Sequence, residues 1–389
     1  MRDTSVIFSV GVWIPGAGMG NHAYYLTAGL DRYNLLTRAF VMRYTGQGLP
    51  PEKISALYFT EKLAYRFARY MHIDQYVVRD NVFDFWVSRQ LGNASLFYGW
   101  THHALWSLKK AKQLGMVTIL ERANSHPITY TKLLDAEYKK RGLRTGLYHP
   151  LIFKKQLKEL QETDYIAVTS QFTKQSLLEQ GIDERRIILT PLGVDTTHYV
   201  PGAFESAGHI SQNEDIFRVV YVGQLCLRKG IPYLLEAWHK LQLKQAELLL
   251  VGDLVDEMKT ILHQVLLQNT TITVLPHRND AVKFYQQASV GILPTLEDGF
   301  GLVVLEAMAC GVPVIITEHT GAKDCMRPNR DGFIIPPYSV DAIADTLQYC
   351  YNHRDQLQEM GQQARQQAEQ FPWTRYQDGI AAHLKTISG

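Results

Sequence analysis

One carboxylate in an apolar helix is the first residue in this sequence whose position suggests chemistry. Residues 294–316 contain a turn with Glu297 and Asp298, followed by a predicted helix whose first two turns are apolar apart from Glu306. An unpaired charge in such a helix is strongly unfavourable. We therefore expect Glu306 to contact a polar ligand at the helix start, and a buried glutamate satisfied by the backbone is the alternative.

A glycine-rich loop near the N-terminus is a second candidate. Gly16, Gly18 and Gly20 separate a predicted strand at residues 6–10 from a predicted helix at 21–30. Such a loop lets backbone N–H groups approach an anion at a helix N-terminus. The spacing matches neither the dinucleotide-binding fingerprint nor a Walker loop, and a tight turn is the alternative interpretation.

Composition bounds the class of protein. The chain has 389 residues, 46% of them hydrophobic, which suits two or three domains with cores of their own. The 40 Lys+Arg and 38 Asp+Glu give a net charge of +2, so the overall charge does not favour nucleic acid. The four cysteines show neither metal-ligand spacing nor a disulfide framework, and no segment resembles a signal peptide or a membrane span. We expect a cytoplasmic protein.

Short β-branched runs alternate with helical periodicity, which is typical of parallel α/β domains. Besides residues 6–10, the predicted strands lie at 96–98, 117–120, 165–168 and 187–189 in the first half, and at 218–222, 247–251, 271–275, 290–293 and 312–317 in the second. Residues 200–215 are polar and rich in turn formers, so they are the predicted linker. The chain is predicted to be helical from 342 onwards, with a break at Phe371-Pro372. The predicted units are Rossmann-like domains at 1–199 and 212–368 and a final helix at 370–389.

Two such domains in tandem resemble the GT-B fold of glycosyltransferases, and local motifs make the resemblance specific to family 4, also called group 1. Residues 298–315, Asp-Gly-Phe-Gly-Leu-Val-Val-Leu-Glu followed by Ala-Met-Ala-Cys-Gly-Val-Pro-Val-Ile, look like the E-x7-E signature of that family. Segments at 191–195, 222–230, 250–253 and 331–336 agree in type and order, whereas the first 150 residues match loosely, through the glycine loop and segment 121–127. The resemblance implies two doubly wound domains facing a cleft, with the last helix crossing back to the N-terminal domain.

The resemblance implies a nucleotide-sugar donor, whose diphosphate gains negative charge as the glycosidic bond breaks. Arg228 and Lys229 correspond to the basic pair of the family and are expected to neutralise that charge, although Gln224 stands where the family often has arginine. A solvated pair in a loop is the alternative. The N–H groups at the helix start are expected to bind the same diphosphate, and Glu306 the donor ribose. The expected donor-binding residues are Gly18, Arg228, Lys229, Gly299, Phe300, Gly301, Leu302, Val303 and Glu306.

The first acid of the motif is ambiguous. Asp298 lies eight positions before Glu306, whereas Glu297 lies one place upstream of that register. Either carboxylate could hydrogen-bond the donor sugar or stabilise positive charge at its anomeric carbon, and the other would cap the turn. His126 matches a histidine in a comparable segment of the family, where it contacts the donor sugar, and an ordinary loop histidine is the alternative. The expected catalytic residues are therefore Asp298, Glu297 and His126.

The activity that the resemblance implies is transfer of a hexose-type sugar to a hydroxyl of a glycan, glycolipid or small glycoside, with retention of anomeric configuration. No metal and no other cofactor is expected, because the sequence has no Asp-x-Asp triplet and no cluster with metal-ligand spacing. A nucleotide-sugar epimerase of the same fold and a non-catalytic nucleotide-sugar or glycan-binding protein are the alternatives.

Two basic regions predict peripheral contact with the inner face of a membrane, and with it a lipid-linked acceptor. Residues 138–158 include seven Lys and Arg and no acid. Lys62, Arg66 and Arg69 recur at near-helical spacing among aromatic residues. Such patches bind anionic lipid headgroups. A solvated helix face over an aromatic core is the alternative.

Overall fold

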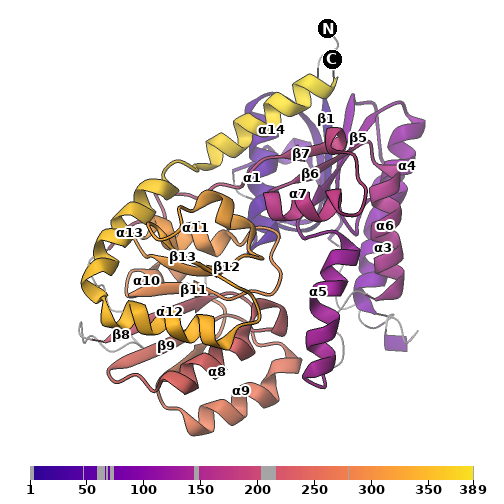
Figure 1. Ribbon diagram of the computed structural model, residues 1–389. Coiled ribbons are helices and arrows are strands. Elements are labelled where there is room, and N and C mark those ends of the chain that lie inside the picture. The colour runs from indigo at the N-terminus through magenta and orange to yellow at the C-terminus, as the bar shows by residue number, and fades with distance from the viewer. Residues whose placement is uncertain are drawn as a thin grey trace.

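The computed structural model describes residues 4–46, 48–58, 66, 69–70, 74–143, 149–202, 216–278 and 280–388. Two sheets form the centres of two lobes, one in each half of the chain. Figure 1 shows the N-terminal lobe in indigo to magenta and the C-terminal lobe in pink to orange, with helices packed around each sheet. The prediction of two doubly wound domains is confirmed.

The N-terminal sheet has seven parallel strands in the order β3-β2-β1-β4-β5-β6-β7. Its strands are β1 Val6–Ile14, β2 Leu36–Tyr44, β3 Ile54–Ala56, β4 Leu96–Trp100, β5 Val117–Arg122, β6 Tyr165–Val168 and β7 Ile187–Leu189. The strand order reverses beside β1, so the crevice at the carboxyl ends of β1 and β4 is the place where such a sheet binds ligands.

The C-terminal sheet has six parallel strands in the order β10-β9-β8-β11-β12-β13. Its strands are β8 Phe217–Val222, β9 Ala246–Val251, β10 Ile272–Leu275, β11 Val290–Leu293, β12 Val314–Thr317 and β13 Gly332–Ile335. Strands β8, β11 and β12 are almost entirely buried, as expected of strands covered by helices on both faces.

Helices cover both sheets. Those of the N-terminal half are α1 Met19–Arg32, α3 Gln75–Ser88, α4 Leu105–Gln113, α5 Pro127–Lys140, α6 Pro150–Glu162 and α7 Gln171–Leu178, with 3-10 turns η1 Pro51–Lys53 and η2 Glu184–Arg186. Those of the C-terminal half are α8 Ile231–Leu241, α9 Asp256–Gln268, α10 Ala281–Tyr285, α11 Leu302–Ala309, α12 Val340–Asn352, α13 Arg354–Ala368 and α14 Trp373–Ser388, with η3 Leu227–Lys229 and η4 Gly321–Cys325.

The predicted strands at 165–168, 187–189 and 290–293 have the observed bounds, and the others are shifted or extended by a few residues. Strand β2, the three-residue β3 and β13 were not predicted. Arg38 and Arg43 interrupt the apolar run of β2, and β13 is only four residues long, so neither has a clear periodicity. The predicted linker lies largely outside the described residues, because 203–215 are not among them.

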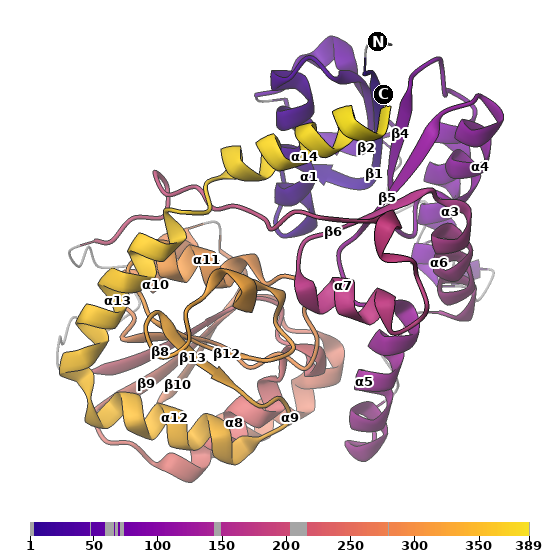
Figure 2. The ribbon, with the colours of Figure 1, turned by 45° about the horizontal axis from the view of Figure 1, so that its top comes forward.

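The last helix returns to the N-terminal lobe, as predicted. Figure 2 shows α14, in yellow, lying across α1. Trp373 stacks on Tyr25 with ring centroids 4.1 Å apart, and the Tyr376 hydroxyl lies 2.7 Å from Nε2 of the buried His22. The aromatic contacts fix the helix to the N-terminal domain even though its sequence follows the C-terminal one.

Candidate functional site

The start of α11 is the centre of the candidate site. The helix begins at Leu302, directly after Gly301, whose φ of 87° lies in the left-handed region. A Cβ at Gly301 would lie 2.9 Å from the side chain of Leu293, so conformation and packing both favour glycine there. The N–H groups of Leu302 and Val303 belong to the first helical turn, which has no intrahelical acceptors. The helix start therefore offers hydrogen-bond donors and the positive end of the macrodipole to an anion.

The basic pair lies on η3, beside the loop that leads into α11. The turn ends at Gly230, where a Cβ would lie 1.8 Å from the carbonyl oxygen of Pro294, so the two segments are in direct contact. The Arg228 guanidinium donates to the backbone carbonyl of Glu297 at 2.8 Å. Lys229 forms an ion pair with Asp298. Two cations and an acid thus lie together at the carboxyl edge of the C-terminal sheet.

Asp298 is held firmly within the C-terminal domain. Its backbone N–H donates to the carbonyl of His319 at 3.0 Å, and its carbonyl accepts from the N–H of Gly321 at 3.0 Å. Burial alone would raise the pKa of the Asp298 carboxyl, but the charges of Lys229 and Arg228 outweigh burial and lower that pKa. Asp298 is therefore ionised at neutral pH.

Glu297, the other candidate first acid, faces the N-terminal domain. Its carboxylate is fully buried, and Oε1 accepts hydrogen bonds from the N–H of Ser125 at 2.9 Å and from the Ser125 hydroxyl at 3.0 Å. Oε2 accepts from Nδ2 of Asn124 at 3.1 Å and lies 3.5 Å from the Arg228 guanidinium. Asp298 therefore pairs with a lysine of its own domain, whereas Glu297 hydrogen-bonds to residues of the N-terminal domain.

Glu306 lies on α11 and is half-buried. Burial raises the pKa of its carboxyl to about 7, and the nearby hydroxyls of Tyr199 and Tyr285 partly oppose that rise. A carboxyl with this pKa changes its protonation state, and with it its capacity to accept hydroxyl hydrogen bonds, near neutral pH. The two tyrosines were not predicted, because they lie 107 and 21 positions before Glu306 and only the fold brings them to it.

His126 is the N-cap of α5 and is almost fully buried. The imidazole Nδ1 accepts a hydrogen bond from the backbone N–H of Ile128 at 3.2 Å. The backbone N–H of His126 donates to the Ser176 hydroxyl at 2.8 Å. Burial, helped by the charge of Arg122, lowers the pKa of His126 to about 4, so the imidazole is neutral at pH 7. His126 directly follows Asn124 and Ser125, which bind Glu297.

Gly18 lies at the start of α1 with a φ of 54° and open space around its Cα. Within the described part of the chain, no hydrogen bond joins it to the C-terminal domain. The structure thus brings together the basic pair, both candidate acids and the start of α11, with the His126 loop facing them from the other domain. Sequence reasoning missed Asn124 and Ser125, although both lie in the segment 121–127 that the resemblance indicated.

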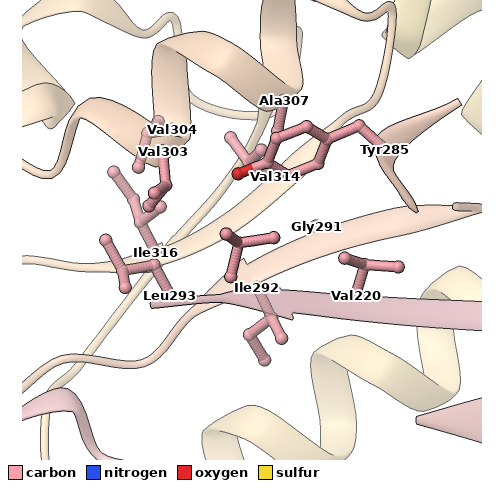
Figure 3. Close-up of a pocket in the computed structure, with 11 residues that line it drawn as sticks. Val220, Tyr285, Gly291, Ile292, Leu293, Val303, Val304, Ala307, Val314 and Ile316 are labelled. Carbon is pink, nitrogen blue, oxygen red and sulfur yellow. The ribbon is translucent and has the colours of Figure 1, made fainter. Parts of the chain in front are cut away.

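A cavity in the core of the C-terminal domain lies behind this site. It has a volume of about 10 Å³, is lined mainly by aliphatic side chains of β8, β11 and α11, and includes the Tyr285 ring, which passes beneath Ala307 in Figure 3. The Tyr285 hydroxyl is buried and has no hydrogen-bond partner among the residues that the structure describes. This space holds one water at most, so it is not a ligand site. Among the same residues, no three His, Cys, Asp or Glu side chains group together as metal ligands.

The fold is the two-domain GT-B architecture. Over 98% of this chain and 99% of the other, the structure is similar to sucrose-phosphate synthase from Thermosynechococcus elongatus, with a TM-score of 0.72 at 19% identity. It is similar to Anabaena HepE, solved with UDP and glucose, over 98% of this chain and 100% of the other, with a TM-score of 0.67 at 16% identity.

Residues 205–367 match the family model of glycosyl transferases group 1. It is 27% identical to the capsular polysaccharide biosynthesis glycosyltransferase CapM of Staphylococcus aureus over 65% of this chain and 71% of CapM. It is also 27% identical to a D-inositol 3-phosphate glycosyltransferase of Paenarthrobacter aurescens (strain TC1) over 50% of each chain. The chain thus spans about half to seven tenths of the length of these relatives.

Proposed function

We propose that this protein transfers a hexose-type sugar from a nucleotide-sugar donor to a hydroxyl of a glycan, glycolipid or small glycoside, with retention of configuration and without a metal ion. The observation that carries the proposal is the grouping of Arg228, Lys229 and Asp298 beside the start of α11. Two cations and a helix N-terminus suit a diphosphate. HepE, which has the same fold, was solved with UDP and glucose.

In this proposal the charge of the leaving group is neutralised by the protein. The bond between the anomeric carbon and the phosphate oxygen breaks, and its electron pair stays on the nucleoside diphosphate, next to Arg228, Lys229 and the N–H groups of α11. These groups take the place of a divalent cation. Glu306 accepts hydrogen bonds from the ribose hydroxyls, and Asp298 faces the donor sugar, where its charge stabilises the electron-poor anomeric carbon.

The acceptor hydroxyl attacks on the face from which the nucleoside diphosphate departs. A bond forms between the acceptor oxygen and the anomeric carbon, and a phosphate oxygen of the leaving group takes the hydroxyl proton. No enzymic nucleophile is needed in this route, which agrees with the ion pair that occupies the Asp298 carboxylate. His126 is neutral at pH 7 and can hydrogen-bond a sugar hydroxyl from the N-terminal side.

A screen of nucleotide sugars for thermal stabilisation tests donor binding, since a ligand at 100 times its Kd stabilises a fold by about 2.7 kcal/mol. The best donor is then incubated with saccharide and lipid-linked acceptors, with and without EDTA, and the product anomer is determined by NMR. We expect transfer with retention in EDTA, lost in Arg228→Met and kept in Arg330→Met, which removes an exposed arginine. Inversion would refute the stereochemical part, and donor binding without transfer or hydrolysis would favour the non-catalytic alternative.

Membrane contact of the two basic regions stays a prediction, and four basic residues of the first region are exposed, namely Lys139, Lys140, Lys154 and Lys158. In the first basic region, Lys155 is buried against Asp84 at 2.9 Å and Arg141 pairs with Glu236 at 2.8 Å, whereas residues 144–148 lie outside the described residues. Most of the second region, including Lys62, also lies outside them. No helix in the described part of the chain is long and apolar enough to cross a membrane.

We propose that the groove between α3 and α4 also contacts an anionic membrane surface. The groove has a volume of about 620 Å³ and joins the exposed rings of Phe85 and Trp106 to the basic side chains of Arg89, Lys109 and Lys110. Aromatic rings with adjacent cations suit the lipid headgroup region. We expect flotation with vesicles of phosphatidylglycerol, weakened by salt and by Lys109→Glu with Lys110→Glu. Absence of flotation at low salt would refute this contact.

A further inference from the structure

We infer that Glu297 is a positioning residue that joins the two domains in the closed form and is not a ligand of the donor. This inference rests on the proposed function, since it assigns a role within the same site. Its physical basis is a set of contacts that we call the Glu297 cluster, formed by Glu297, Asn124, Ser125 and Arg228.

The Glu297 cluster leaves no acceptor capacity for a sugar hydroxyl. A carboxylate has about four lone-pair sites. Three of them accept from the Ser125 N–H, the Ser125 hydroxyl and Nδ2 of Asn124, and the Arg228 guanidinium lies beside the remaining one. The side chain is also completely buried. A donor sugar would have to displace domain contacts to reach Glu297.

The loop around Glu297 is in close contact with the N-terminal domain. The carbonyl of Gly299 accepts from the Ser170 hydroxyl at 2.6 Å and the Thr173 hydroxyl at 3.3 Å, both from α7 and its N-cap. A Cβ at Gly299 would lie 1.8 Å from the carbonyl oxygen of Ala123. This part of the domain contact therefore consists of closely packed backbone and short side chains, to which Glu297 adds a charged group.

The position of the cluster along the chain explains why it matters for the reaction. Glu297 precedes Asp298, and Ser125 precedes His126, so the cluster joins the two loops that carry the expected catalytic residues of opposite domains. It thereby sets the distance between Asp298 and His126 when the domains close. The basic pair and the start of α11 belong to the C-terminal domain, and Arg228 is held there by its hydrogen bond to the backbone carbonyl of Glu297. The diphosphate contacts therefore do not depend on closure.

The inference is tested with Glu297→Gln. The amide places an N–H₂ donor where the carboxylate accepted from Asn124 or Ser125, so closure is weakened while the charge at Asp298 is unchanged. We expect a larger radius of gyration by X-ray scattering in the presence of UDP, a fall of about 100-fold in kcat, and an unchanged Kd for UDP by calorimetry. The matched control is Glu318→Gln, which alters an exposed acid after β12 and should leave all three quantities unchanged.

A compensating change separates positioning from loss of the fold. The double variant Glu297→Gln, Asn124→Asp places the amide donor at residue 297 and the carboxylate acceptor at residue 124, the reverse of the wild type. It should therefore restore part of the closure and of kcat. The inference is overturned if Glu297→Gln weakens UDP or donor binding with unchanged scattering, because Glu297 would then be a donor ligand. A wild-type protein inactive with every nucleotide sugar would refute the proposed function instead, and the scattering comparison would still decide the role of the cluster.

Discussion

A single methyl group at residue 299 should keep the two domains apart. The φ of Gly299 lies outside the left-handed region, so the backbone accepts alanine there. The added Cβ would lie 1.8 Å from the carbonyl oxygen of Ala123, 2.7 Å from its carbonyl carbon and 2.9 Å from Cα of Asn124. All three are backbone atoms, so no side-chain rotation relieves the clash.

The size of the effect follows from these distances. An ordinary carbon–oxygen contact is about 3.3 Å or longer, so the two loops must separate by roughly 1.5 Å. Such a displacement stretches the three hydrogen bonds of Glu297, now 2.9 to 3.1 Å long, beyond the normal range. Hydrogen bonds to charged groups contribute about 1.5 to 3 kcal/mol each. Losing the equivalent of only one of them lowers the ratio of closed to open protein by about 10- to 150-fold.

The assay is X-ray scattering with and without UDP, followed by transfer kinetics. Gly299→Ala should give a larger radius of gyration with UDP and a much lower kcat, with the melting temperature of each domain little changed. Gly92→Ala is the control, because residue 92 has open space around it and lies far from the domain contact along the chain. A Gly299→Ala protein with the scattering profile and turnover of the wild type would show that the domains do not meet at this loop in the working enzyme.

Three further predictions concern the charges. Arg228→Met and Lys229→Met should each weaken UDP binding by about 10-fold or more, measured by calorimetry, because each removes a charge-assisted contact to the diphosphate. The Kd for UDP should fall as pH rises from 6 to 8, because Glu306 has a pKa of about 7 and accepts ribose hydroxyls best when it is ionised. Glu306→Gln should abolish this pH dependence. A wild-type Kd that does not change with pH would contradict the prediction. Burial raises the pKa of Glu121 to about 8 from an ordinary value of 4.5, so its contribution to stability is complete below pH 4.5 and is lost as pH rises through 8. We therefore expect the free energy of unfolding, measured with denaturant, to fall less towards pH 9 in Glu121→Gln than in the wild type, by an amount on the order of 4 to 5 kcal/mol. Equal losses in the two proteins would refute the buried state of Glu121.

The fold was largely predictable because its signals are local. Buried parallel strands such as β6, β7 and β11 are short apolar runs bounded by polar turns, and their ends agreed with the structure. Strand β2 was not predictable, because Arg38 and Arg43 lie within it and only its position between β1 and β3 makes it a strand. The family resemblance predicted that the final helix crosses back to the N-terminal domain. Its aromatic contacts with α1 depend on the tertiary structure and could not be predicted from the sequence.

By itself the sequence determined the turn and apolar helix of residues 294–316, the adjacent basic pair and the presence of two neighbouring acids, because all of these depend on residue types at short spacing. It left open which acid faces the donor. Adjacent side chains in an extended loop point in opposite directions, and their surroundings come from other parts of the chain: Lys229 for Asp298, and Ser125, 172 positions away, for Glu297. Only the tertiary structure, by closing the N-terminal domain onto this loop, gave the two carboxylates different partners.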